Sequence, residues 1–195
     1  MKKLITILFA TLLSVGVFAQ AQFGIKAGLN IAAIGSSDSD WNEMISSKAG
    51  IQFGGVATIP FGDVVQLRTG AIYSQKGATV DVLGTDIILA VDYLEVPADF
   101  TFMLGDGGFA LSAGPYFAFL MSAKAKADGE SEDMEDVSAM DLGLNFGASF
   151  TIAESMIIDA RYGMGLMNLV DDADDDDETM LNGCFSISFA YMFGG

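Results

Sequence analysis

Strict alternation of apolar and polar side chains constrains this chain most. In residues 140–152, MDLGLNFGASFTI, the large apolar residues fall on one face of an extended strand and the small or polar residues on the other. A period of two predicts a β-strand. In a soluble sandwich the apolar face is the core. In an outer-membrane barrel it meets lipid, and the small polar face lines the interior.

Similar segments recur along the chain, and no long helical periodicity follows the N-terminal region. The sequence predicts eight strands, at Phe23–Ala32, Ala49–Pro60, Val65–Lys76, Ile87–Met103, Phe109–Ala123, Ala139–Ile152, Met156–Leu169 and Gly183–Phe193.

The predicted connections alternate in length. Long ones are expected at 33–48, 77–86, 124–138 and 170–182, and short ones at 61–64, 104–108 and 153–155. In an up-and-down barrel every second connection lies at the same end, so one rim carries all the long loops. We therefore predict an all-β fold, an eight-stranded antiparallel up-and-down transmembrane β-barrel with short periplasmic turns and long outer loops.

The composition of the two faces indicates which one points inward. An eight-stranded barrel has an interior only wide enough for side chains, and the face rich in Phe, Leu, Ile and Met would not fit inside. The apolar face is therefore expected to meet lipid. Aromatic residues on that face gather near the rim with short turns, as an interfacial belt does. The belt consists of Phe23, Phe61, Phe100, Phe102, Phe109, Phe150, Tyr191 and Phe193.

The N-terminus resembles an export signal. Lys2 and Lys3 precede an apolar run, residues 4–17, and a small-x-small site follows at residues 19–21. The run is shorter than the roughly 20 residues that a membrane-spanning helix needs. We expect residues 1–21 to be a cleaved signal peptide and residues 22–195 to form the barrel domain.

Charge and composition exclude several functions. The formal net charge is −17 and becomes −19 without Lys2 and Lys3, which argues against nucleic acid as a partner. The chain has no histidine, which rules out Ser-His catalysis and histidine-ligated metals. Cys184 is the only cysteine, so no internal disulfide can form. We expect neither an enzyme nor a cofactor.

Charged residues also fall on the predicted inward face. They are Lys26, Arg68, Lys76, Glu95, Asp99, Asp141, Asp159 and Arg161. Buried charges need partners. If Leu83 and Gly84 form a two-residue turn, antiparallel pairing places Arg68 opposite Asp99. The main interpretation is a polar plug that fills the barrel, and the alternative is a proton or ion path.

Two runs of acidic residues fall in the predicted outer loops. One is DGESEDMED at 128–136, and the other comprises Asp171, Asp172, Asp174, Asp175, Asp176, Asp177 and Glu178. Neither has the ligand spacing of a calcium loop. They are expected to be solvated, mutually repelling loops, with weak divalent-cation binding as the alternative.

The chain resembles the outer-membrane β-barrel family that includes the PorT-like proteins. The resemblance rests on GIKAGLN at 24–30, YSQKGA at 73–78, DYLEVP at 92–97, LSAGPYFAFLMSAK at 111–124 and IDARYGMGLMNL at 158–169. It implies an eight-stranded exported barrel without known catalytic residues, and some relatives serve a protein-secretion system. The acidic loops and the YMFGG ending depart from the family pattern.

These observations predict a small non-enzymatic barrel in the cell outer membrane, in contact with its lipid, with a structural or interaction role. One alternative is a component of a protein-secretion or envelope-assembly complex, with other envelope proteins as partners. A second alternative is an exported soluble β-barrel that binds an apolar ligand in its interior.

Overall fold

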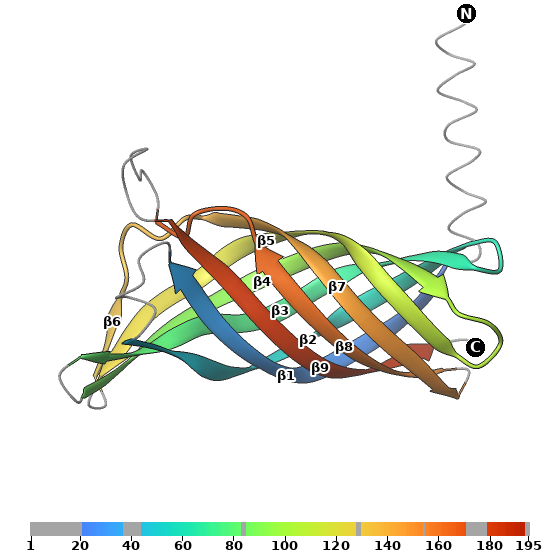
Figure 1. The fold of residues 1–195 in the computed structure, drawn as a ribbon, viewed down its shortest axis with the longest axis horizontal. Coiled ribbons are helices and arrows are strands. Elements are labelled where there is room, and N and C mark those ends of the chain that lie inside the picture. The colour runs from blue at the N-terminus through green and yellow to red at the C-terminus, as the bar shows by residue number, and fades with distance from the viewer. Residues whose placement is uncertain are drawn as a thin grey trace, which may run out of the picture.

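The chain folds into a closed barrel of antiparallel strands (Figure 1). The computed structural model describes residues 21–36, 44–82, 85–127, 130–153, 155–170 and 179–193. The strands are β1 (Gln22–Ser36), β2 (Ile45–Phe61), β3 (Val65–Val82), β4 (Thr85–Met103), β5 (Phe109–Ala127), β6 (Glu130–Asp133), β7 (Met140–Ala153), β8 (Met156–Gly165) and β9 (Met180–Phe193). Within the described residues, no helix is long and apolar enough to cross a membrane.

Eight of these strands form the ring, which confirms the predicted fold. Each ring strand pairs with its neighbours along the chain, and β1 pairs with β9 to close the barrel. The short strand β6, which the sequence does not predict, pairs with the last four residues of β5, 124–127. Closure leaves no free edge in the ring, so its backbone groups are satisfied by neighbouring strands.

The two ends of the barrel differ. Phe23 pairs with Phe193, so both ends of the described barrel lie at one end of the molecule, here called the terminal end. Residues 62–64 and 104–108 also make short turns there. At the opposite end, here called the far end, β3, β4 and β5 run on and β6 is added (Figure 1).

Because the strands extend further than predicted, two of the predicted long loops are wrong. Residues 77–86 are not a loop: β3 and β4 stay paired up to Val82 and Thr85. Most of the expected loop 124–138 is also strand, because β5 reaches Ala127 and pairs with β6. β-branched residues, which favour extended strands, are frequent in residues 79–88. Conversely, β8 ends at Gly165 and not at Leu169, which turns inward and is buried.

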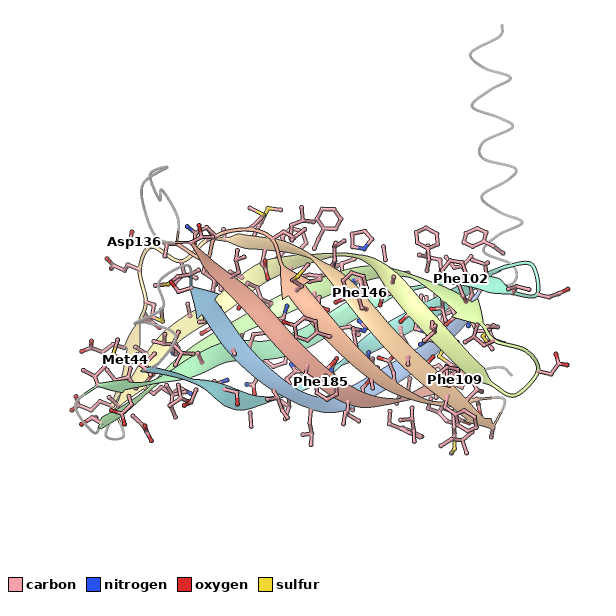
Figure 2. All side chains as sticks on the ribbon, viewed as in Figure 1. Met44, Phe102, Phe109, Asp136, Phe146 and Phe185 are labelled. Atoms are coloured by element: carbon pink, nitrogen blue, oxygen red, sulfur yellow. The ribbon has the colours of Figure 1, made fainter. Side chains whose placement is uncertain are left out.

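Most large apolar side chains point away from the barrel axis. Phe102, Phe109, Phe146 and Phe185 are all exposed in the isolated chain, and Figure 2 shows them along the outside of the barrel. Every member of the predicted aromatic belt is likewise exposed. The soluble alternative requires the apolar face of the strands to point inward and is therefore wrong.

The height of the apolar surface fits a bilayer. On β4 the outward residues run from Phe102 to Leu94, and the next outward residue is Asp92. The ten steps from Phe102 to Asp92, where the outward face turns polar, cover ~33 Å along the chain, or ~25 Å along the axis at the usual barrel tilt. An apolar band of about 25 Å is typical of outer-membrane barrels.

Gly77 is required where β3 leaves this band. Its φ is 120°, and an added Cβ would overlap the carbonyl oxygen of Leu89. We expect Gly77→Val to cost ~1–3 kcal/mol and to speed amide exchange in residues 78–82 and 85–90. At Gly55 an added Cβ meets nothing within 4 Å, so Gly55→Val should leave exchange unchanged. Equal exchange in the two variants would contradict the prediction.

The predicted signal peptide and several predicted loop features fall on residues that the structure does not describe. Residues 1–20 of the predicted signal peptide, Leu83 and Gly84, and residues 171–178, which carry the seven acidic residues suggested as weak divalent ligands, lie outside the described residues.

Candidate functional site

The interior charge cluster is the most distinctive feature of the lumen. It consists of the eight residues that alternation places inside: Lys26 on β1, Arg68 and Lys76 on β3, Glu95 and Asp99 on β4, Asp141 on β7, and Asp159 and Arg161 on β8. Each is buried, and none is more than 8% exposed. Four cations face four carboxylates, so the cluster is formally neutral.

Asp159 is the centre of the part of the cluster that lies nearer the terminal end. Its Oδ1 lies 3.0 Å from Lys26 Nζ and 3.5 Å from Arg161 Nη2, and its Oδ2 lies 3.6 Å from Arg68 Nη1. Ser188 donates a hydrogen bond to Oδ1 at 3.5 Å. One carboxylate thus balances cations from three strands.

Lys76 is the centre of the part of the cluster that lies nearer the far end. Its Nζ lies 3.0 Å from Glu95 Oε2 and 3.9 Å from Asp141 Oδ2. It also lies 4.2 Å from the ring centre of Tyr116 and 5.6 Å from that of Tyr93. Such contacts between an ammonium group and aromatic rings are favourable when water is excluded. Lys76 is therefore enclosed on several sides.

Hydrogen bonds fix the groups around Lys76. Tyr116 donates to Asp141 Oδ2 at 3.0 Å, and Asn182 Nδ2 donates to the same oxygen at 3.0 Å. Asn182 also donates to the Tyr93 hydroxyl at 3.3 Å. The aromatic rings are thus held by polar contacts at their hydroxyl ends, as buried tyrosines usually are.

Arg161 joins the two halves. Its Nη2 lies 3.1 Å from Asp99 Oδ2, and its Nη1 lies 4.0 Å from Glu95 Oε1. Asn145 Nδ2 donates to Asp99 Oδ1 at 3.1 Å. Because Arg161 also contacts Asp159, all eight charges form one continuous network.

Apolar side chains adjoin the charges on both sides. The far-end apolar cluster comprises Ile34, Ala78, Val91, Tyr93, Tyr116, Ala118, Ala123 and Leu169. The terminal-end apolar cluster comprises Val56, Ile72, Ile157, Ala190 and Met192. A hollow of about 10 Å³ lies among Asn30, Lys76, Glu95 and Arg161, which is space for about one water molecule.

The expected partner of Arg68 needs correction. The register does place Arg68 opposite Asp99, as the two-residue turn predicted. The charged ends nevertheless diverge: Arg68 approaches Asp159, and Asp99 contacts Arg161. In so narrow a barrel, contacts across the lumen compete with contacts between adjacent strands. Arg68 Nε has no hydrogen-bond partner among the described residues.

Sequence reasoning found the charges but not their polar and aromatic supports. The sequence did not reveal the roles of Tyr116, Asn145 and Asn182, although alternation along each strand places all three on the inward face. Cys184 is buried on the inward face. In the described part of the chain, no group of three or more Cys, Asp or Glu side chains could hold a metal ion.

Comparisons with known proteins agree with this architecture. The family model for the outer membrane protein beta-barrel domain matches residues 18–171. Neisserial surface protein A (NspA) has a similar structure, with a TM-score of 0.59 and 18% identity over 89% of this chain and 99% of that one.

Ail, the attachment invasion locus protein of Yersinia pestis, solved in complex with the heparin analogue sucrose octasulfate, has a TM-score of 0.49. It is 17% identical over 89% of this chain and 99% of that one. At these identities the likeness concerns the fold alone. A comparison with curated proteins found no match.

Proposed function

Because the chain belongs to the outer membrane protein beta-barrel domain family, we propose that it is a closed, non-enzymatic barrel with a structural or interaction role at the cell envelope. The barrel lies in the outer membrane, with its apolar face in lipid. The far end, with its extended strands, faces outside, and the terminal end faces the periplasm.

The filled interior is the observation that carries this proposal. The far-end apolar cluster, the interior charge cluster and the terminal-end apolar cluster together occupy the lumen. Ions cross a barrel through a hydrated path, and apolar constrictions oppose hydration. A barrel packed in this way is suited to holding its wall rigid and not to conduction.

The same packing supports a role without catalysis. General acid–base catalysis needs a proton-transfer group within reach of a substrate. In the interior charge cluster each carboxylate lies within 4.0 Å of a cation, and the cluster is buried. We therefore assign interaction with other molecules to the ends of the strands that extend outside the membrane, and not to the lumen.

The outer strands carry an acidic surface. β6 contains Glu130, Glu132 and Asp133, all exposed, and Asp81 lies directly opposite Asp86 near the tip of the β3–β4 hairpin. A protein partner would have to be complementary in charge. A place in a secretion or envelope-assembly complex is a more specific form of this proposal, supported by the family resemblance.

Conductance measurements test the closed barrel. The protein inserted into a planar lipid bilayer should show no stepwise ion current. A double variant Tyr93→Ser/Tyr116→Ser, which removes two large side chains from the far-end apolar cluster, serves as a positive control and should admit small currents. Reproducible unitary currents from the unaltered barrel would contradict the proposal. A stable stoichiometric partner after mild cross-linking would support the complex.

A further inference from the structure

The distribution of positive charge singles out two lysines on β5. The chain has nine Lys and Arg residues. Lys2 and Lys3 belong to the predicted signal peptide, and four cations form part of the interior charge cluster. Lys48, Lys124 and Lys126 remain.

Lys48 has a role within the barrel wall. The pairing of β2 with β3 shifts register between Ser47 and Gln52. At this interruption Lys48 Nζ donates a hydrogen bond to the backbone oxygen of Lys76 at 3.2 Å. Lys48 thus joins two strands where backbone pairing is interrupted, and Lys124 and Lys126 are the cations without such a role.

Both lysines point outward from the barrel. Ala123 is buried in the far-end apolar cluster, so alternation turns Lys124 and Lys126 to the opposite face. Lys126 is exposed, and the Lys124 side chain is 45% exposed. Lys124 pairs with Ala90 and Lys126 with Ile88 on β4, so neither neighbour on that strand offers a polar partner.

The lysines stand directly above the lipid-facing surface. Met121, 60% exposed, is the last large apolar outward residue on β5. On β3 and β4, the next two strands around the ring, Tyr73 donates a hydrogen bond to Asp92 at 2.7 Å, which marks the change from apolar to polar surface. A tyrosine with its hydroxyl toward water is typical of a membrane interface.

The height of the lysines corresponds to the lipid headgroups. Lys124 is three residues beyond Met121, ~10 Å along the strand and ~8 Å along the axis at the usual tilt. Lys126 is two residues further, ~13 Å along the axis, so its ammonium group reaches the headgroups only when the side chain bends toward the membrane. The headgroup layer on each side of a bilayer is about 5–8 Å thick. A lysine side chain can bend toward that layer while its stem stays on the barrel.

We infer that Lys124 and Lys126 hold a phosphate group of an outer-leaflet glycolipid headgroup. Lysine binds phosphate as a compact point charge. The acidic partner of Lys124 is Asp133, at 3.5 Å and with its side chain 83% exposed, and so exposed a pair contributes little. A phosphate can replace it. The pair gives a mostly acidic outer end one sector that attracts the anionic leaflet.

Mixed nanodiscs provide the test. The barrel is reconstituted with equal amounts of diphosphorylated lipid A and its fully dephosphorylated form, and the lipid retained by the protein is measured by native mass spectrometry. We expect a preference for the phosphorylated lipid that falls about 30-fold in Lys124→Gln/Lys126→Gln, at ~1 kcal/mol for each lysine. Asp133→Asn removes the competing carboxylate and should keep or strengthen the preference.

Further controls distinguish headgroup binding from a change in the fold and from binding of free phosphate. Circular dichroism in the same nanodiscs should show an unchanged barrel in both variants. Equal retention of the two lipids, or an unchanged preference in the double lysine variant, would overturn the inference. Inorganic phosphate at millimolar concentration should compete weakly. Saturable binding of free phosphate without any lipid preference would overturn the assignment to a lipid headgroup.

Discussion

Replacing Arg161 with methionine is expected to lower the free energy of unfolding by about 3–5 kcal/mol, the range found when one partner of a buried ion pair is removed. Arg161 contacts Asp99 at 3.1 Å, Asp159 at 3.5 Å and Glu95 at 4.0 Å. Methionine keeps the packing volume of the stem but leaves these carboxylates with less positive charge. Urea titration of the barrel folded in phospholipid vesicles measures the loss.

Arg68→Met is the matched control. It removes the same charge from the same cluster, but Arg68 has one contact with a carboxylate, at 3.6 Å, and Asp159 keeps Lys26 and Arg161. We expect less than half the loss. Adding Asp99→Asn should recover part of the stability of Arg161→Met, because Asn145 can still donate to the amide oxygen. The same addition should not rescue Arg68→Met. Equal losses in the two arginine variants would contradict this assignment of contacts.

The pairing of the charges could not be read from the sequence, although their location could. Alternation alone shows that Arg68 and Asp159 both face the lumen, because side chains along a strand point to opposite faces in turn. Partner choice depends on which strands face one another across the lumen. β3 and β8 are not neighbours in the ring, and a long arginine side chain can span the gap.

The far end shows a second limit of local pattern. Hydrophobic alternation weakens beyond the lipid-facing band, so the sequence predicts loops at 77–86 and 124–138. Pairing with neighbours keeps them extended: Val80 pairs with Ile45 and Ile87, and Ala125 with Leu89 and Glu132. Cross-strand contacts of this kind depend on the partner strands, which a single segment does not reveal. The tyrosines around Lys76 illustrate the same point, since their partners Asp141 and Asn182 come from other strands of the barrel.

The lipid-facing assignment leads to the second large effect. Phe146 lies near the middle of β7, outward and 49% exposed, and Phe150 lies on the same face in the aromatic belt, 47% exposed. Phe146→Arg should cost about 2–4 kcal/mol, as for a cation near the bilayer midplane, and Phe150→Arg about 0–1 kcal/mol, as near an interface. Unfolding in urea, in vesicles of one lipid composition, measures both.

Depth is the variable that this pair isolates. The two positions share strand, face, residue type and exposure, and lie ~10 Å apart along the axis, four residues at the usual rise and tilt. Phe146→Leu keeps the site apolar and separates loss of the ring from introduction of charge, so it should cost less than Phe146→Arg. If β7 met water and not lipid, the two arginine variants would lose equal stability. A larger loss at Phe150 would place the bilayer midplane nearer the terminal end than the aromatic belt indicates.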